Sequence, residues 1–157
     1  MKVKVKRLHP EAQIPTYTHQ GDACFDLRAA TIGNGDDAVM VWPDRPLEIG
    51  TGLAFEVPDG HVMLVFSRSG HGFNSGVTLA NCVGVVDSNY RGEVRVKLTG
   101  RPVVNDAGEV GPNLFVQVGD RVAQAMILPA PMVELVEADQ LGETDRGEKG
   151  LGSSGVK

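Results

Sequence analysis

The residues best suited to chemistry lie in the stretch NCVGVVDSNYRGEVRVKL, residues 81–98. An apolar run leads into Asp87, a polar turn follows, and an alternating segment continues the chain. This pattern predicts that Asp87 and Tyr90 stand at the mouth of a β-hairpin. A carboxylate there can act as a general base or metal ligand, and a tyrosine can form a flat wall for a ring. An ordinary turn with an exposed tyrosine fits the stretch equally well, so both interpretations remain open.

Two further segments carry groups that bind phosphate. SRSGHG at 67–72 and RGEKGLGSSG at 146–155 each combine an arginine with hydroxyl groups and with glycines, whose amides can approach an anion closely. The second segment also fits the pattern GxGxxG, but no strand and helix surround it, so a dinucleotide-binding fold is not expected. A polar turn and a flexible Gly/Ser tail remain open as alternatives.

Single polar residues in apolar surroundings extend this set. Gln124 interrupts the apolar run of residues 119–129, and a buried amide must find partners in the backbone or in a ligand. Asp26 lies beside apolar residues in GDACFDLRAA, residues 21–30. The histidines lack metal-ligand spacing, and the serines lack a GxSxG pattern, so neither a zinc site nor a hydrolase triad is predicted.

The elements that must position these residues are strands. Period-two alternation occurs at residues 2–8 and 93–99, and less strictly at 53–58 and 114–118, with turn clusters between them. No amphipathic helix longer than two turns is indicated. The pattern predicts an all-β sandwich or barrel. The alternating lysines of KVKVK suit an exposed sheet edge better than a nucleic-acid patch.

The composition narrows the class of protein. A chain of 157 residues with 41% hydrophobic content fits one compact domain. The net charge of -5 argues against a nucleic-acid partner. No segment is apolar enough to span a membrane or to serve as a signal peptide, and Cys24 and Cys82 are expected to be free thiols. The sequence therefore predicts a cytoplasmic protein without a membrane partner.

The composition shifts after Leu141, so residues 1–141 are expected to form the β domain and residues 142–157 a flexible C-terminal tail.

Five segments in order, GDACFDLRAA, SRSGHG, GVVDSNYRGE, GDRVAQ and RGEKGLGSSG, resemble the five motifs of the trimeric deoxyuridine triphosphate nucleotidohydrolases, the dUTPases. The resemblance runs from about residue 20 to residue 155. It implies a jelly-roll-like β-barrel or sandwich and a homotrimer with active sites between subunits, over which the tail closes as a lid. The implied reaction is hydrolysis of dUTP to dUMP and pyrophosphate by Mg²⁺-assisted, in-line attack of water on the α-phosphorus. Such a reaction limits uracil incorporation into DNA and supplies dUMP for thymidylate synthesis.

The resemblance also implies roles for individual residues. Asp87 would orient the attacking water and contact the sugar 3′-hydroxyl, and Gln124 would lie near the α-phosphate. Tyr90 would lie against deoxyribose and exclude a 2′-hydroxyl, and Asp26 would join the water network of Mg²⁺. The base would be read by Asn81 and by the hairpin backbone around Gly84. The implied phosphate-binding residues are Arg68, Ser69, Gly70, Arg146, Gly152, Ser153 and Ser154.

The sequence departs from the family pattern in its tail. Leu151 stands where an aromatic residue usually covers uracil, and Lys149 where a glycine is usual, which predicts weaker lid closure. Two other functions stay open. The dCTP deaminases share the fold and the trimer, although RSGHG departs from their RSSxAR-like segment. A regulatory module that binds nucleotide without hydrolysing it is the third possibility.

Overall fold

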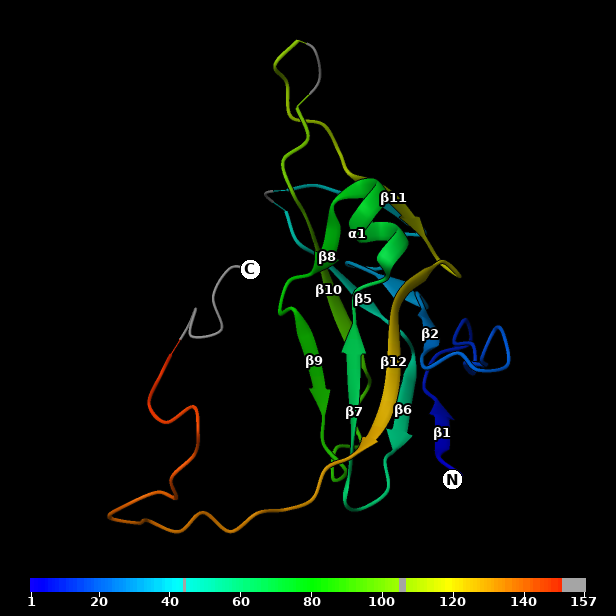
Figure 1. Cartoon of the computed structure of the whole chain (residues 1–157). Coiled ribbons are helices and arrows are strands. Elements are labelled where there is room, and N and C mark those ends of the chain that lie inside the picture. Colours follow the sequence, from blue (N-terminus) through cyan, green and yellow to red (C-terminus); the bar gives the residue numbers. More distant parts are fainter. Residues whose placement is uncertain (44, 105–106, 151–157) are drawn as a thin grey trace.

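The computed structural model describes residues 1–43, 45–104 and 107–150 (Figure 1). These residues form strands and one short helix, α1 (Ser69–Ser75), so the all-β prediction is confirmed. The helix has fewer than two full turns, as expected. The strands are β1 (Lys4–Arg7), β2 (Phe25–Arg28), β3 (Thr31–Ile32), β4 (Ala38–Val41), β5 (Leu47–Gly50), β6 (Leu53–Glu56), β7 (His61–Phe66), β8 (Val77–Leu79), β9 (Val83–Val86), β10 (Arg95–Gly100), β11 (Leu114–Gln117) and β12 (Arg121–Pro129).

Two four-stranded antiparallel sheets make up most of the body. One has the strand order β2-β12-β7-β9, and the other has the order β3-β5-β10-β8. Two smaller sheets, β1-β6 and β11-β4, complete the arrangement. None of these sheets, as far as the chain is described, closes on itself into a barrel.

Alternating side chains explain how the two large sheets share one core. In β7, Met63 and Val65 are buried, and in β10 the same spacing buries Val96 and Leu98. Arg95 and the other polar residues of β10 point to the opposite face, as the period of two requires. The expected strands at 2–8, 53–58 and 114–118 are confirmed with shorter ends, and the strand expected at 93–99 runs from Arg95 to Gly100.

The predicted β-hairpin around Asp87 is wrong. β9 pairs with β7, whereas β10 lies in the other sheet, between β5 and β8. Both edges of β10 are thus already occupied, which leaves no edge for β9. The turn that carries Asp87 consequently joins two sheets, and the space between its arms is open to a ligand.

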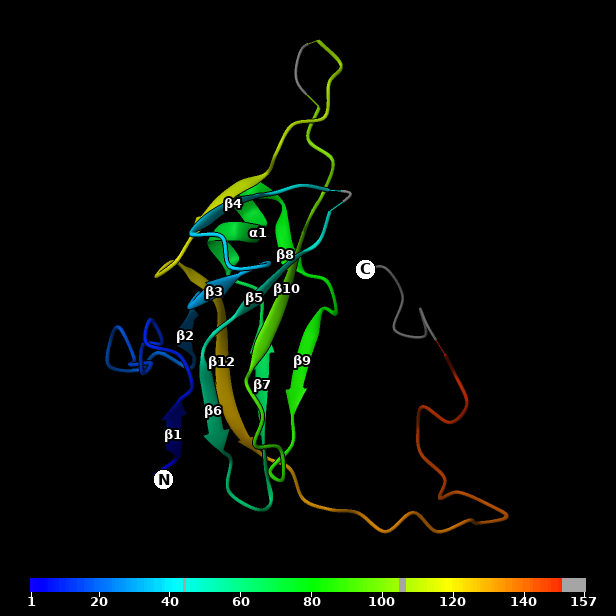
Figure 2. The same cartoon turned by 180° about the vertical axis from the view of Figure 1, so that it is seen from behind.

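The two ends of the described chain differ. Among the described strands, β1 pairs with β6 alone. The ammonium of Lys4 contacts Glu56 at 3.0 Å, and this hydrogen bond lowers the pKa of Glu56. After β12, residues 131–150 run away from the body and are exposed (Figure 2). No helix among the described residues is long and apolar enough to cross a membrane.

Candidate active site

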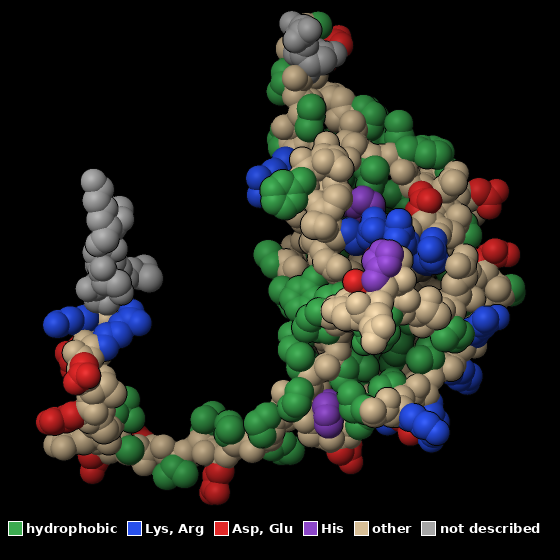
Figure 3. All heavy atoms as spheres, turned by 45° about the vertical axis from the view of Figure 1, so that its right-hand side comes forward, with side chains coloured by type: hydrophobic (Ala, Val, Ile, Leu, Met, Phe, Trp, Pro, Cys, Tyr) green, Lys and Arg blue, Asp and Glu red, His purple; other side chains and the backbone are tan. Residues whose placement is uncertain are grey.

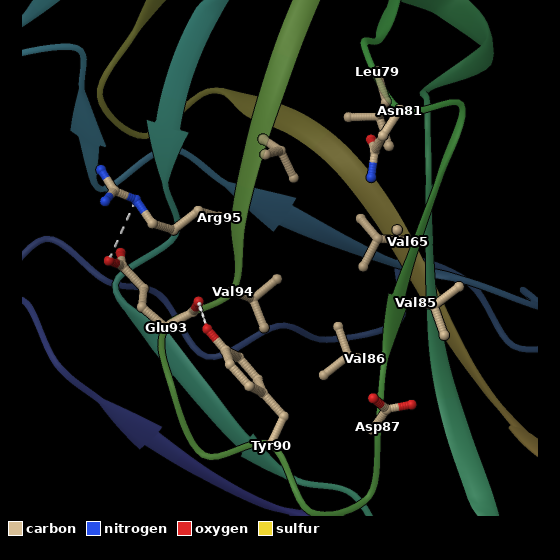
Figure 4. A pocket seen from close by; sticks show the side chains of 12 residues that line it. Val65, Leu79, Asn81, Val85, Val86, Asp87, Tyr90, Glu93, Val94 and Arg95 are labelled. Carbon is tan, nitrogen blue, oxygen red and sulfur yellow. Dashed lines mark hydrogen bonds and ion pairs between the residues drawn. The ribbon is translucent and has the colours of Figure 1, made fainter.

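A cavity of about 300 Å³ opens between β9 and β10 (Figure 4). Its walls combine valines from both strands with a few polar side chains, a mixture typical of small-molecule sites. Four of the predicted site residues line it, namely Asn81, Gly84, Asp87 and Tyr90. Glu93 and Arg95, which the sequence analysis did not single out, line it as well. We call this cavity the nucleoside pocket.

One end of the nucleoside pocket is formed by a tight backbone turn before β9. The Val83 amide donates to the Asn81 carbonyl at 2.7 Å, and Cys82 between them has a φ of 63°, which is unusual for a residue with a side chain. The exposed Asn81 amide donates to the Val83 carbonyl. Gly84 faces Val65, because an added Cβ would lie 3.1 Å from the Val65 Cβ. At this end the Gly84 backbone therefore packs closely against the Val65 side chain.

The opposite end carries the Asp87 turn. The Tyr90 amide donates to the Asp87 carbonyl at 3.1 Å, and the Arg91 guanidinium donates to the carbonyls of Ser88 and Tyr90. The Tyr90 hydroxyl donates to the backbone carbonyl of Glu93 at 2.9 Å. Asp87 is exposed and lines the pocket (Figure 4). A carboxylate so placed can accept a proton from a water molecule or a sugar hydroxyl.

The second group of predicted residues surrounds the turn after β7, which we call the phosphate turn (Ser67–His71). Ser67 fixes its start, because the Ser67 hydroxyl accepts the Leu79 amide at 2.8 Å. Gln124 of β12 donates its side-chain amide to the Ser67 carbonyl at 2.9 Å, so this amide finds a backbone partner. Ser69 and Gly70 follow at the exposed beginning of α1.

Arg68 is held by a carboxylate. Its Nε lies 2.9 Å from Asp26 Oδ1, and Arg121 Nη1 lies 3.3 Å from Asp26 Oδ2, so Asp26 bridges two arginines. The Arg68 and Asp26 side chains are only 22% and 20% exposed, which makes this pair stronger than a surface pair. Basic, acidic and histidine side chains gather on this part of the body in Figure 3. Arg121 is a residue that the sequence analysis missed, although it lies within GDRVAQ.

His71 and Cys24 adjoin the same charged cluster. Burial lowers the pKa of the His71 imidazole, and the Arg68 guanidinium lowers it further, while Asp120 and Asp26 oppose this shift. Burial also raises the pKa of the Cys24 thiol, with a further contribution from Asp26. The cluster therefore favours a neutral His71 and a protonated Cys24.

The Asp87 end of the nucleoside pocket and the phosphate turn lie at opposite ends of the same sheet. Val86 pairs with Met63, so Asp87 continues toward the start of β7, whereas Arg68 follows the end of β7 (Figure 1). About six residues of extended chain, or roughly 20 Å, separate the two along the strand direction. One chain thus brings together the residues of each group but does not bring Asp87 next to Arg68, Ser69 or Gln124.

Arg146 lies far along the exposed tail. Its guanidinium donates to the backbone carbonyls of Lys149 and Gly150, which folds the tail into a local loop. Figure 3 shows this tail apart from the body. The predicted tail residues Leu151, Gly152, Ser153 and Ser154 lie outside the described residues.

The donor set for a metal is sparse. Among the described residues, no cluster of three or more His, Cys, Asp or Glu side chains could hold an ion. Mg²⁺ commonly binds through one or two carboxylates together with substrate phosphates and water. Asp26, the carboxylate that the sequence analysis associates with Mg²⁺, has both oxygens in contact with arginines.

Comparisons with known proteins identify the family of this chain. A family model described as dUTPase matches residues 10–155. The chain belongs to the dUTPase family. It is 40% identical to the deoxyuridine 5′-triphosphate nucleotidohydrolase of Helicobacter hepaticus, over 99% of this chain and 90% of that protein. The corresponding protein of Nautilia profundicola is 39% identical over 99% of both chains.

Solved dUTPase structures share the fold. A mutant dUTPase of Staphylococcus bacteriophage 80alpha with dUpNHpp is similar with a TM-score of 0.79, 25% sequence identity and 99% coverage of each chain. A second structure of the 80alpha dUTPase with dUPNHPP gives a TM-score of 0.78 and 27% identity over 99% of each chain. The family resemblance drawn from the five sequence segments is therefore confirmed.

Proposed function

We propose that the chain hydrolyses dUTP to dUMP and pyrophosphate by in-line attack of water on the α-phosphorus. The observation that carries this proposal is the nucleoside pocket itself, which places Asp87, Tyr90 and Asn81 of a dUTPase-family chain around one cavity. In the cytoplasm the reaction would limit uracil incorporation into DNA and supply dUMP for thymidylate synthesis.

The pocket residues divide the recognition of the nucleoside between them. Asn81 and the backbone near Gly84 read the uracil edge, and cytosine is rejected because its exchanged donors and acceptors leave buried groups unpaired. The Tyr90 ring lies against deoxyribose and leaves no space for a 2′-hydroxyl. Asp87 contacts the 3′-hydroxyl and accepts the proton of the attacking water.

The phosphate turn holds the triphosphate. Arg68, Ser69 and Gly70 offer a guanidinium, a hydroxyl and a backbone amide to the phosphate oxygens, and Gln124 lies near the α-phosphate. Arg146 and the tail residues Gly152, Ser153 and Ser154 close over the outer phosphates, and Leu151 covers the base. The Asp26 carboxylate orients Arg68 and Arg121, and it would also face the water shell of the metal. Bound Mg²⁺ supplies charge neutralisation on the phosphate oxygens.

The active enzyme is a homotrimer whose sites are shared between subunits, in a jelly-roll arrangement. The separation of roughly 20 Å within one chain supports this proposal, because a single triphosphate nucleotide must meet both groups. Exposed apolar side chains also support it, since Val85 of β9 is 64% exposed, and Met132 and Leu135 of the arm after β12 are 98% and 91% exposed. Apolar patches of this kind mark contacts between chains.

Release of pyrophosphate tests the function. The purified protein with Mg²⁺ is given dUTP, dCTP, dTTP or UTP in parallel, and pyrophosphate and ammonia are both measured. We expect rapid release of pyrophosphate from dUTP alone and no release when EDTA removes the metal. Ammonia from dCTP would favour the deaminase, and tight dUTP binding without turnover would favour a regulatory module.

A further inference from the structure

We propose that Glu93 is a positioning residue that sets the discrimination between deoxyribose and ribose, because it holds the Tyr90 ring in place. This inference rests on the function proposed above, in which Tyr90 faces the sugar. It assigns to Glu93 a role in selectivity rather than in the chemical step.

The position of the Tyr90 ring depends on the backbone that follows it. The Tyr90 hydroxyl donates to the Glu93 carbonyl at 2.9 Å, which fixes the far end of the ring (Figure 4). The ring also occupies the space above Gly92, where an added Cβ would collide with the Tyr90 hydroxyl. Any shift of the Gly92–Glu93 backbone therefore moves the ring.

The Glu93 side chain ties the Gly92–Glu93 backbone to the chain that follows β5. Its Oε1 accepts the backbone amide of Gly52 at 2.7 Å, in the turn between β5 and β6. The carboxylate fits closely there, since an added Cβ at Gly50 would collide with Glu93 Oε1 and with the Thr31 hydroxyl. A charged acceptor on a partly buried amide makes a stronger hydrogen bond than a neutral one. The Tyr90 anchor is thereby connected to the core of the body.

A second contact of Glu93 is weaker. Its Oε2 lies 3.8 Å from Arg95 Nε, and Arg95 in turn lies 2.9 Å from Glu48. The contact between Glu93 and Arg95 is long, and the Arg95 side chain is 50% exposed, so solvent screens this pair and its contribution is small. The hydrogen bond to Gly52 is therefore the contact on which the anchor depends.

The consequence concerns the 2′-hydroxyl. dUTP and UTP differ only at this group, so the space left by the Tyr90 ring decides between them. Without the Glu93 carboxylate, the Gly92–Glu93 backbone and the ring gain freedom, and a ribose can be accommodated. Asp87 lies on the β9 side of the turn, so the chemical step should be less affected than sugar selection.

The experiment compares kcat and KM for dUTP and UTP in four variants. Glu93→Ala should lower the dUTP/UTP ratio of kcat/KM about tenfold, the effect of one hydrogen bond to a charged group. Most of the fall in this ratio should come from changes in KM. The kcat for dUTP should stay within about threefold of the wild-type value. Glu93→Gln keeps an acceptor for Gly52 and should restore most of the ratio. Tyr90→Phe should act like Glu93→Ala, and the double variant should add little to either.

Glu48→Ala is the matched control, because it removes the other carboxylate beside Arg95 without touching the Tyr90 anchor. A dUTP/UTP ratio in Glu93→Ala equal to that in Glu48→Ala overturns the inference while the proposed function stands. A wild-type protein that does not prefer dUTP to UTP overturns both. If Glu93→Ala does not fold, Glu93→Asp, which is too short to reach Gly52, takes its place with the same expected loss.

Discussion

The nucleoside pocket and the phosphate turn are both built at turns that follow strands of one sheet, yet they are held in different ways. Around Tyr90 the fastening is largely by hydrogen bonds to backbone groups. Around Arg68 the fastening is by side chains, since Asp26 forms an ion pair with it and Gln124 binds the neighbouring carbonyl. A backbone wall gives a fixed shape, whereas an ion pair can be exchanged for another anion.

This difference suggests how the two regions divide the work. A fixed wall suits the selection of a base and a sugar, where a misplaced atom must be refused. An arginine already paired with a carboxylate is kept oriented, and a triphosphate with more charge can compete for its remaining donors. Changes in the pocket should therefore alter the chemistry and the choice of substrate, and changes near Arg68 should alter the grip on phosphate.

Asp87→Asn should give the largest effect. Loss of the general base should lower kcat for dUTP roughly a thousandfold, while the Kd for dUTP measured by calorimetry should change little. Asp59→Asn, at an exposed carboxylate in the turn before β7, is the control and should keep normal turnover. Near-normal kcat in Asp87→Asn would refute the role of this carboxylate.

Mixing two inactive variants tests whether the two regions of one site belong to different chains. Asp87→Asn and Arg68→Ala chains are unfolded together in equal amounts and refolded, and dUTP hydrolysis is measured. If each site takes Asp87 from one subunit and Arg68 from another, roughly a quarter of the wild-type activity should return. Activity no higher than that of the separate variants would place both residues in the same chain's site.

Arg146→Ala should have an intermediate effect that belongs to the phosphate side. The loss of charge-assisted hydrogen bonds from the tail should lower kcat/KM for dUTP about thirtyfold. The Tm should not change, because the tail is exposed and does not contribute to the core. Arg7→Ala, at an exposed arginine on β1, serves as the control for loss of one positive charge. An equal loss of kcat/KM in Arg146→Ala and Arg7→Ala would contradict the proposed role of Arg146 in closing the tail over the phosphates.

The smallest expected difference between the two regions is in the reactivity of their cysteines. Cys24 adjoins the phosphate side and Cys82 adjoins Asn81 in the nucleoside pocket, and both are free thiols. Because burial raises the pKa of Cys24, its reactive thiolate form should be scarce at pH 7.5 and should increase at a higher pH than for an ordinary thiol. Iodoacetamide at pH 7.5, followed by mass spectrometry, should therefore modify the exposed Cys82 first. Equal rates at pH 7.5 and at pH 9 for Cys24 would contradict this expectation.

Local patterns in the sequence predicted the strands but not their neighbours. Alternation located β10 and β11, in which buried and more exposed side chains alternate, and the apolar segment at 53–58 located β6, most of which is buried. The same pattern around Asp87 suggested a hairpin, because the order of residues does not reveal that both edges of β10 are occupied. Partner choice is a property of the whole sheet.

The site was predictable to a similar degree. Asp87 and Tyr90 were found because they stand in one short stretch, Asn81 was found through the family resemblance, and all three share a pocket. Glu93 stands at the end of that stretch, but its role depends on Gly52, which is 41 residues away in the sequence. Arg121 likewise acts through Asp26, 95 residues away. Contacts over such separations arise only when the sheets have formed.

The extended segment after β12 has a consequence for enzyme kinetics. Arg146 lies about seventeen residues after the end of β12, and that length of extended chain can reach roughly 58 Å, so in the proposed trimer Arg146 would stay within range of a neighbouring subunit. A tether of this kind gives its binding group an effective concentration near the millimolar range, whatever the amount of protein in solution. Turnover per site should then stay constant on dilution until the subunits themselves separate.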